Sequence, residues 1–172
     1  MKPFMQSFGT EWVWSQPRFF RRSYELRAGE ELLATLESRA IFNSAAIATT
    51  AGGRTLLRHT GLFRGAVLLS GEDAGPPRIS FQPRWFGVGV ARCGGGLELH
   101  WKRADFWGRS WRFEDVNALP VLSFVRRAAW LKPTVSVEPS EAARALPELA
   151  DLTLLGFYLL LLMQRQAHAA AS

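Results

Sequence analysis

The chain has 172 residues, of which 48% are hydrophobic and 21% are charged. This length and balance are typical of one globular domain, so we expect a single domain over residues 1–172. The single cysteine, Cys93, excludes a disulfide bond within the chain and argues against a cysteine-based metal site. The formal net charge of +6 favours anionic partners, although an arginine-rich composition also arises from GC-rich genomes.

The N-terminal segment MKPFMQSFGTEW has no continuous apolar region, so no signal peptide is expected. A lone cysteine is also typical of proteins in a reducing compartment. The sequence therefore predicts a cytoplasmic protein, and peripheral attachment to a membrane is left open.

Short alternating segments separated by turn residues predict that most of the chain is β-structure. Residues 24–27 and 32–36 form a first predicted hairpin. Residues 45–50 and 54–60 form a second one across Gly52-Gly53, which is a strong hairpin signal. Further strands are predicted at 65–70, 78–82, 86–93, 97–102, 110–116, 118–127 and 134–139.

The strand at 97–102 shows the alternation most clearly. Leu97, Leu99 and Trp101 point to one face, and the residues between them are polar. Trp111 and Phe113 repeat this pattern in the next strand. Roughly ten to twelve short strands at this spacing predict a barrel or a sandwich.

The pattern becomes helical near the C-terminus, where Ser140 is a candidate cap and a helix is expected at about 146–166. Pro147 either kinks this segment or begins a new helix. Glu148 and Asp151 suit the N-terminal end of the helix dipole. The last residues, AHAAAS, are expected to be frayed.

This helix is apolar on all sides, so it must be buried in protein or in a bilayer. Leu152 to Met163 is a run of twelve residues without a charge, about 18 Å long against about 30 Å of hydrocarbon. We therefore expect no transmembrane span but a closed antiparallel β-barrel of about 12 strands that encloses the helix. A tail-anchored protein is the alternative, and it requires Glu148 and Asp151 to enter lipid, which is costly.

The segments ELADLTLLGFYLLLLM, FGVGVARCGGGLELHWK and SWRFEDV together carry a resemblance to a known superfamily. In strand pattern and final helix, nearly the whole chain resembles the Tubby C-terminal-like fold of Tubby proteins, phospholipid scramblases and LURP-one-related proteins. The resemblance implies a barrel of about twelve strands around a central hydrophobic helix, and a role at a lipid surface. The likeness is architectural, because no short diagnostic motif is matched.

No catalytic constellation is predicted. Glu114 and Asp115 are adjacent, so on a strand they face opposite sides, and a solvated turn is the simpler interpretation. Gly87 to Arg92 lacks the third glycine of a dinucleotide loop. Cys93 follows Arg92, which would lower a thiol pKa, but a buried or turn cysteine is the commoner case. We expect no enzyme and no cofactor.

The histidines do not predict a metal site. His59, His100 and His168 show no ligand spacing with one another or with Cys93. His59 and His100 are interpreted as outward strand residues, and His168 lies in the tail.

Basic residues cluster beside aromatic ones at three places. Arg18, Arg21 and Arg22 surround Phe19-Phe20, Lys102 and Arg103 precede Phe106-Trp107, and Arg126 and Arg127 precede Trp130. Such a mixture suits an anionic phospholipid surface. There are three alternatives. One is a solvated exterior with inward aromatics, and another is a protein partner. The third, which is less favoured, is single-stranded nucleic acid that stacks on the aromatics.

The leading hypothesis is a non-enzymatic binding or scaffold protein at an anionic phospholipid surface. Its candidate phosphate contacts are Lys102, Arg103, Arg126 and Arg127.

Overall fold

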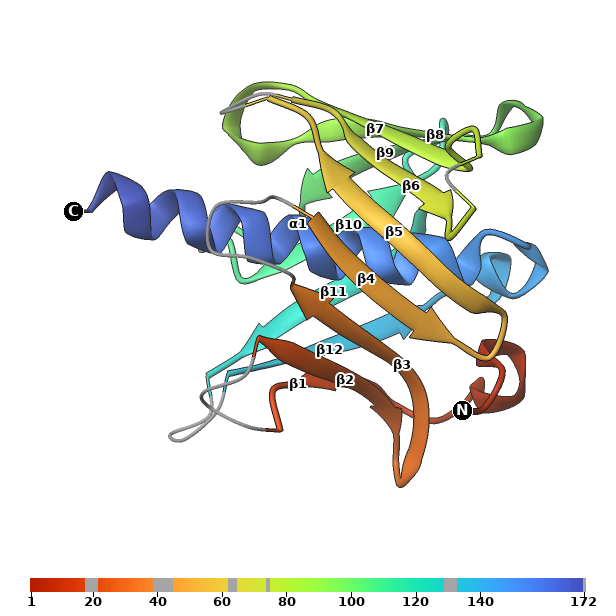
Figure 1. Cartoon of the computed structure of the whole chain (residues 1–172). Coiled ribbons are helices and arrows are strands. Elements are labelled where there is room, and N and C mark those ends of the chain that lie inside the picture. Colours follow the sequence, from red (N-terminus) through yellow and green to blue (C-terminus); the bar gives the residue numbers. More distant parts are fainter. Residues whose placement is uncertain (18–21, 39–44, 62–64, 74, 129–132, 172) are drawn as a thin grey trace.

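The protein is a closed antiparallel barrel around one helix (Figure 1). The computed structural model describes residues 1–17, 22–38, 45–61, 65–73, 75–128 and 133–171. Within these residues, twelve strands pair with their neighbours in sequence, and β1 closes the ring on β12. The predicted fold class is confirmed. The strands are β1 (Trp12–Ser15), β2 (Ser23–Ala28), β3 (Glu31–Ser38), β4 (Ala45–Thr50), β5 (Gly53–His59), β6 (Val67–Gly71), β7 (Ile79–Pro83), β8 (Gly89–Cys93), β9 (Glu98–Arg103), β10 (Ser110–Glu114), β11 (Pro120–Arg127) and β12 (Thr134–Pro139).

Buried and more exposed residues alternate along most strands, as a barrel with one filled interior requires. On β9, Leu99 and Trp101 are fully buried, and His100 between them is partly exposed. Trp12 and Trp14 alternate in the same way on β1. The strand β1 was not predicted, because only four residues form it and two of them are tryptophans on the inner face.

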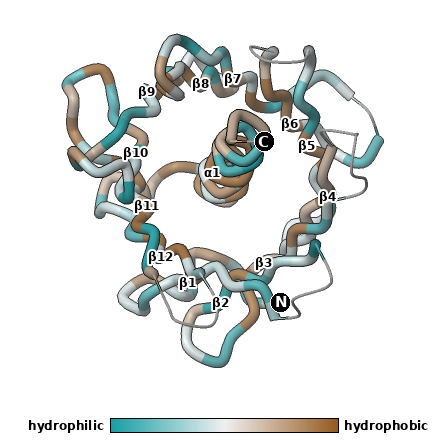
Figure 2. Tube along the Cα trace, turned by 90° about the vertical axis from the view of Figure 1, so that its left-hand side faces the viewer, coloured by the Kyte–Doolittle hydropathy of each residue, from teal (hydrophilic) through white to brown (hydrophobic). Residues whose placement is uncertain are grey.

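The helix α1 (Leu149–Ala170) runs through the ring of strands, and Figure 2 shows it inside the barrel. Residues 152–160 are all buried, so the apolar circumference is covered by protein. Within the described chain, no helix combines the length and the apolar character that crossing a bilayer would take.

The bounds of the helix differ from the expected 146–166. A short 3-10 helix, η4 (Glu141–Ala145), comes first, and Ser140 before it makes no side-chain capping hydrogen bond. Pro147 lies two residues before α1 and neither kinks nor begins it. At the other end the helix continues to Ala170, where a frayed tail was expected, because Ala, Gln and Arg all favour helix even without packing.

Close packing sets the position of the helix in the barrel. Gly156 faces Phe124 of β11, and a Cβ atom placed on Gly156 would lie 2.2 Å from the Phe124 ring. Phe157 stacks on Trp14 with ring centroids 4.3 Å apart. The glycine thus lets an aromatic ring from the wall reach the helix backbone.

The first turn of α1 is tied to the wall by charge. Asp151 accepts hydrogen bonds from Arg78 Nε at 2.8 Å and from Arg78 Nη2 at 2.9 Å. Arg78 Nη2 also donates to the Thr55 hydroxyl at 2.7 Å. This bidentate pair fixes the helix against β5 and the start of β7.

Candidate functional site

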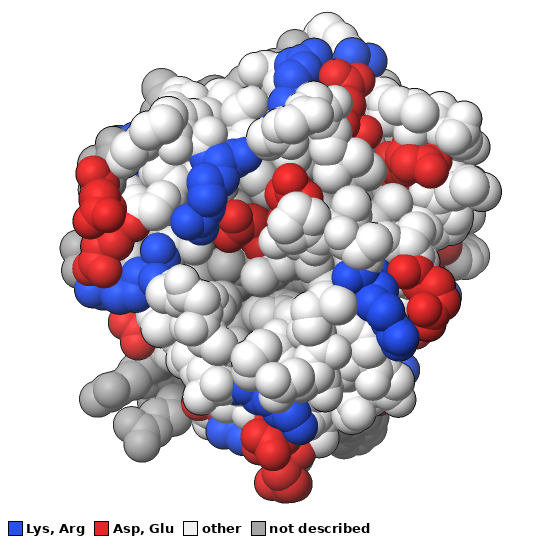
Figure 3. All heavy atoms as spheres, turned by 90° about the vertical axis from the view of Figure 1, so that its right-hand side faces the viewer, with Lys and Arg blue, Asp and Glu red and all other residues white. Residues whose placement is uncertain are grey.

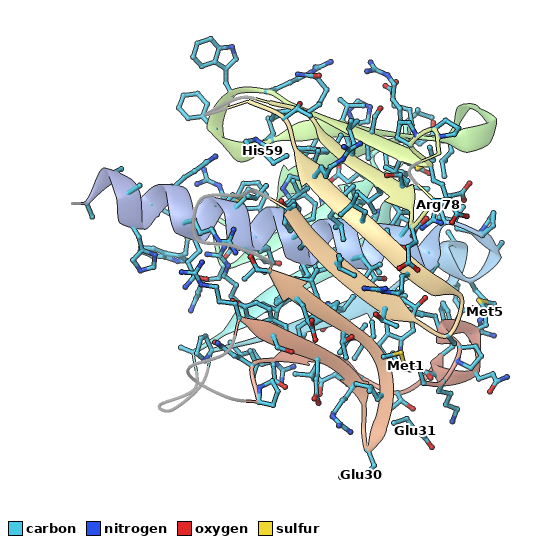
Figure 4. All side chains as sticks on the ribbon, in the orientation of Figure 1. Met1, Met5, Glu30, Glu31, His59 and Arg78 are labelled. Atoms are coloured by element: carbon cyan, nitrogen blue, oxygen red, sulfur yellow. The ribbon has the colours of Figure 1, made fainter. Side chains whose placement is uncertain are left out.

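The barrel has two unlike ends. At one end, called the open end here, the odd-numbered strands finish and the last turns of α1 leave the barrel, on the left of Figure 1. At the opposite, closed end lie the N-terminus and the short turns that lead from even-numbered strands. In Figure 4, His59 lies toward the open end and Arg78, Met5 and Glu30 toward the closed end.

The connections at the two ends differ in amino-acid composition. Each connection from an odd-numbered strand to the next contains at least one Phe or Trp and at least one Arg or Lys. Asp105 is the only acidic residue in these segments. The connections that leave even-numbered strands contain no aromatic residue. Part of this pattern, including Arg18, Phe19, Phe20, Arg21, Trp130 and Lys132, lies outside the described residues.

Two described connections at the open end expose large aromatic side chains. Between β7 and β8, Trp85 is 65% exposed and Phe86 is 95% exposed. Between β9 and β10, Phe106 is 82% exposed and Trp107 is 75% exposed. Large apolar groups gathered on one surface usually mark a contact with a partner or a membrane.

The β7–β8 connection is held in a defined shape. Arg84 N donates to Val88 O at 2.7 Å across the turn. Phe86 has φ 58°, a backbone conformation that non-glycine residues rarely adopt, and it points the ring away from the wall. A Cβ atom on Gly87 would lie 3.2 Å from Trp111 and 3.3 Å from Met163, so this turn packs against both wall and helix.

The β9–β10 connection is also ordered by hydrogen bonds. Asp105 Oδ1 accepts from Ser110 N at 2.9 Å, and Gly108 O accepts from Trp111 Nε1 at 3.1 Å. The Phe106 and Trp107 rings meet edge to face at 5.4 Å. Both pairs of aromatic side chains therefore lie on turns that hydrogen bonds hold in place, and they point to solvent instead of into the barrel.

Positive charge accompanies these aromatics. Arg84 and Arg103 are exposed and form no ion pair within the described residues, and Arg109 lies 3.8 Å from Asp105. The closed end is different, since Figure 3 shows acidic and basic side chains interspersed there. Among the described connections, only those at the open end present basic and aromatic side chains together.

The four predicted phosphate contacts do not form one cluster. Lys102 lies on the outer wall, with its Nζ 3.1 Å from Glu114 Oε2. Arg127 also faces outward and pairs with Glu11 at 2.6 Å. Arg103 is exposed at the end of β9, beside the connection that carries Phe106.

Arg126 points the other way. It follows the buried Phe124 by two residues, so its side chain lies on the inner face, where Nη2 donates to Leu160 O at 2.9 Å. Burial lowers the pKa of this guanidinium below its ordinary value.

Two cavities flank α1 at the open end. One, of about 290 Å³, lies beneath the Trp85 and Phe86 turn and reaches Leu159 and Met163 of the helix. The other, also of about 290 Å³, lies between the helix and the neighbouring strands β1 and β12 and includes Arg126. Both are lined by apolar side chains together with a few polar ones, which is the usual character of a ligand pocket.

Two predictions about polar residues were wrong. Glu114 is 3% exposed, not part of a solvated turn, because Arg112 and Lys102 lie over it on the outer wall. His59 shares the inner face with Leu57 and lines the cavity beneath Trp85, so it is not an outward residue. Burial lowers the pKa of His59, and a backbone hydrogen bond to Gly65 opposes this shift in part.

Cys93 and His100 are two remaining sequence candidates within the described residues. Burial, with added repulsion from Glu148 and Asp151, raises the pKa of Cys93 to about 12, so the thiol stays protonated. His100 lies on the outer face as predicted. In the part of the chain that the structure describes, no three His, Cys, Asp or Glu side chains gather closely enough to hold a metal ion.

No family model, curated protein or solved structure matches this chain. The barrel and its helix are shown by the structure, and the likeness to the Tubby C-terminal-like superfamily stays a prediction from the sequence pattern.

Proposed function

We propose that this chain is a non-enzymatic binding protein that attaches to the surface of an anionic phospholipid bilayer through its open end. The observation that carries the proposal is the pair of ordered turns that expose Trp85, Phe86, Phe106 and Trp107 beside arginines. Aromatic side chains of this kind enter the interfacial layer of a bilayer, while arginines stay at the phosphate level.

The magnitudes support a reversible attachment. Full burial of one Trp or Phe side chain contributes about 1.5–3 kcal/mol, and one Arg near an anionic surface contributes about 1 kcal/mol. The four aromatics with Arg84, Arg103 and Arg109 can therefore supply several kcal/mol, which is enough for peripheral binding. Of the four residues that the sequence singled out, Arg103 is best placed to contact phosphate.

Flotation with liposomes tests this proposal. The intact protein is expected to float with vesicles that contain phosphatidylserine, to float less at high salt, and to stay unbound with neutral vesicles. Replacing Trp85, Phe86, Phe106 and Trp107 together by Ser is expected to reduce the bound fraction at least tenfold.

The matched control replaces exposed apolar residues of the closed end, Met5, Val116 and Leu119, by Ser. This variant should bind like the wild type. Equal loss in both variants would contradict a role for the open end. If the wild type floats with neither kind of vesicle, the aromatic surface instead serves a protein partner.

A further inference from the structure

The cavity that includes Arg126 is lined by both polar and apolar side chains. Its volume is about 290 Å³. Its lining includes apolar side chains from the wall and from α1, namely Trp14, Val135, Phe157, Leu160 and Leu161. The lining also includes uncharged polar side chains, namely Ser15, Gln16, Thr134 and Gln164. Among the described residues that line this cavity, Arg126 is the one ionised side chain.

Arg126 is partly buried without a counter-charge. Its one side-chain hydrogen bond to the described residues goes to the neutral carbonyl of Leu160. None of the ion pairs of the described residues includes Arg126, whereas its neighbour Arg127 is paired with Glu11. The residues outside the described set contain no Asp or Glu, so no side-chain carboxylate of the chain is left to neutralise it.

This arrangement is costly unless an anion arrives. A guanidinium has five N–H donors in a planar fork, and one of them is used by the described residues. Taking a cation out of water carries a penalty that a bound carboxylate or phosphate would offset by charge-assisted hydrogen bonds. The structure thus holds an anion-binding group and apolar side chains in the lining of one cavity.

We infer that this cavity binds one single-chain anionic lipid, with its phosphate or carboxylate head on Arg126 and the first part of its chain along Phe157 and Leu161. The cavity lies at the lower limit of ligand pockets, about 300 Å³, so it suits one alkyl chain and not two. This inference deepens the proposed function, because it rests on the open end facing a bilayer as the source of such lipids.

The test uses monomeric ligands, so that no bilayer is needed. Isothermal titration calorimetry with decyl phosphate, below its critical micelle concentration, is expected to show saturable binding at one site. Decanoate distinguishes the carboxylate head from the phosphate head, and binding of either supports the inference. Inorganic phosphate and decyltrimethylammonium should bind at least about tenfold more weakly, since each lacks the chain or the negative charge.

The neighbouring arginine offers a matched control. Arg126→Gln should weaken decyl phosphate binding at least about tenfold, Arg126→Lys should restore part of it, and Arg127→Gln should leave it unchanged. Leu161→Trp, which fills the cavity and keeps Arg126, should also weaken binding, and thermal unfolding checks that each variant is folded. Equal loss in the Arg126 and Arg127 variants, or equal affinity for inorganic phosphate, would overturn the inference.

The two proposals can fail separately. If vesicles bind and decyl phosphate does not, the lipid pocket is refuted and the membrane surface stands. If decyl phosphate binds to Arg126 and vesicles do not bind, the pocket stands without a bilayer as its source.

Discussion

The protonation of Glu114 makes the stability of the barrel depend on pH. Burial alone would raise the pKa of this carboxyl group, but hydrogen bonds and charge from Arg112 and Lys102 outweigh burial and lower it below 4.5. The carboxylate is therefore more stable in the folded state than in the unfolded state. Its contribution to stability is complete above about pH 4.5 and is lost as pH falls through the lower folded pKa.

The variant Glu114→Gln tests this linkage by urea unfolding. Near pH 7 we expect the variant to lose about 1–3 kcal/mol of unfolding free energy, because two cations lose a buried partner. At about pH 3 the difference from the wild type should become smaller. A difference that stays constant or grows on acidification would show that the stated direction of the pKa shift is wrong.

Gly156 provides a second prediction at the residue scale. In an exposed helix Ala would be more stable than Gly by about 1 kcal/mol. Here a Cβ atom would lie 2.2 Å from the buried Phe124 ring, so Gly156→Ala should destabilise the protein by about 1–3 kcal/mol or more. Denaturant unfolding measures this, with Gly94→Ala as the control because that Cβ meets open space. A stabilised Gly156→Ala variant would contradict the packing described.

Some of these residues could be predicted from sequence and some could not. The inward positions of Trp101, Trp111 and Phe113 follow from strict alternation. His59 could have been placed on the inner face by continuing the alternation from Leu57. Glu114 could not, because the pairing of β10 with β11 shifts register between Phe113 and Glu114, and its cover comes from Lys102 on the adjacent strand.

At the scale of elements, α1 is the core of the barrel and not an attachment to it. Deleting residues 146–172 removes the side chains that fill the interior, and burial of each large one contributes about 1.5–3 kcal/mol. We expect the truncated chain to be insoluble or unfolded by circular dichroism and size-exclusion chromatography. Deleting only residues 167–172, which are exposed where described, should leave fold and stability nearly unchanged. A folded, soluble product of the longer deletion would refute the role of the helix.

The helix was predictable as an element because apolar residues cover its whole circumference. A helix of this kind is stable only when it is buried. The two ends of the helix were not predictable. The helix begins at Leu149, after a separate 3-10 helix, and its last residues stay helical without packing. The strand pairs with glycine turns were predictable from local sequence, and β1 was missed because only four residues form it, between η1 (Phe4–Ser7) and the first predicted hairpin.

At the scale of the whole molecule, strand direction separates two kinds of surface. Consecutive antiparallel strands send alternate connections to opposite ends, so the segments with Phe, Trp and Arg share the open end. The sequence shows aromatic residues in every second connection, but this regularity has meaning only after all the strands are assigned. For that reason Trp85 and Phe86 were not among the predicted contacts, although Arg103 was.

The orientation on a membrane tests the central claim most directly. A polarity-sensitive fluorophore is attached to a new cysteine at Phe86→Cys, and in a second variant at Val116→Cys on the closed end. Cys93 is buried, with its pKa raised to about 12, so it should remain unlabelled, and the wild type controls for this. With phosphatidylserine vesicles, we expect a blue shift at position 86 and none at position 116. A shift at position 116, or none at position 86 while the protein is bound, would contradict attachment through the open end.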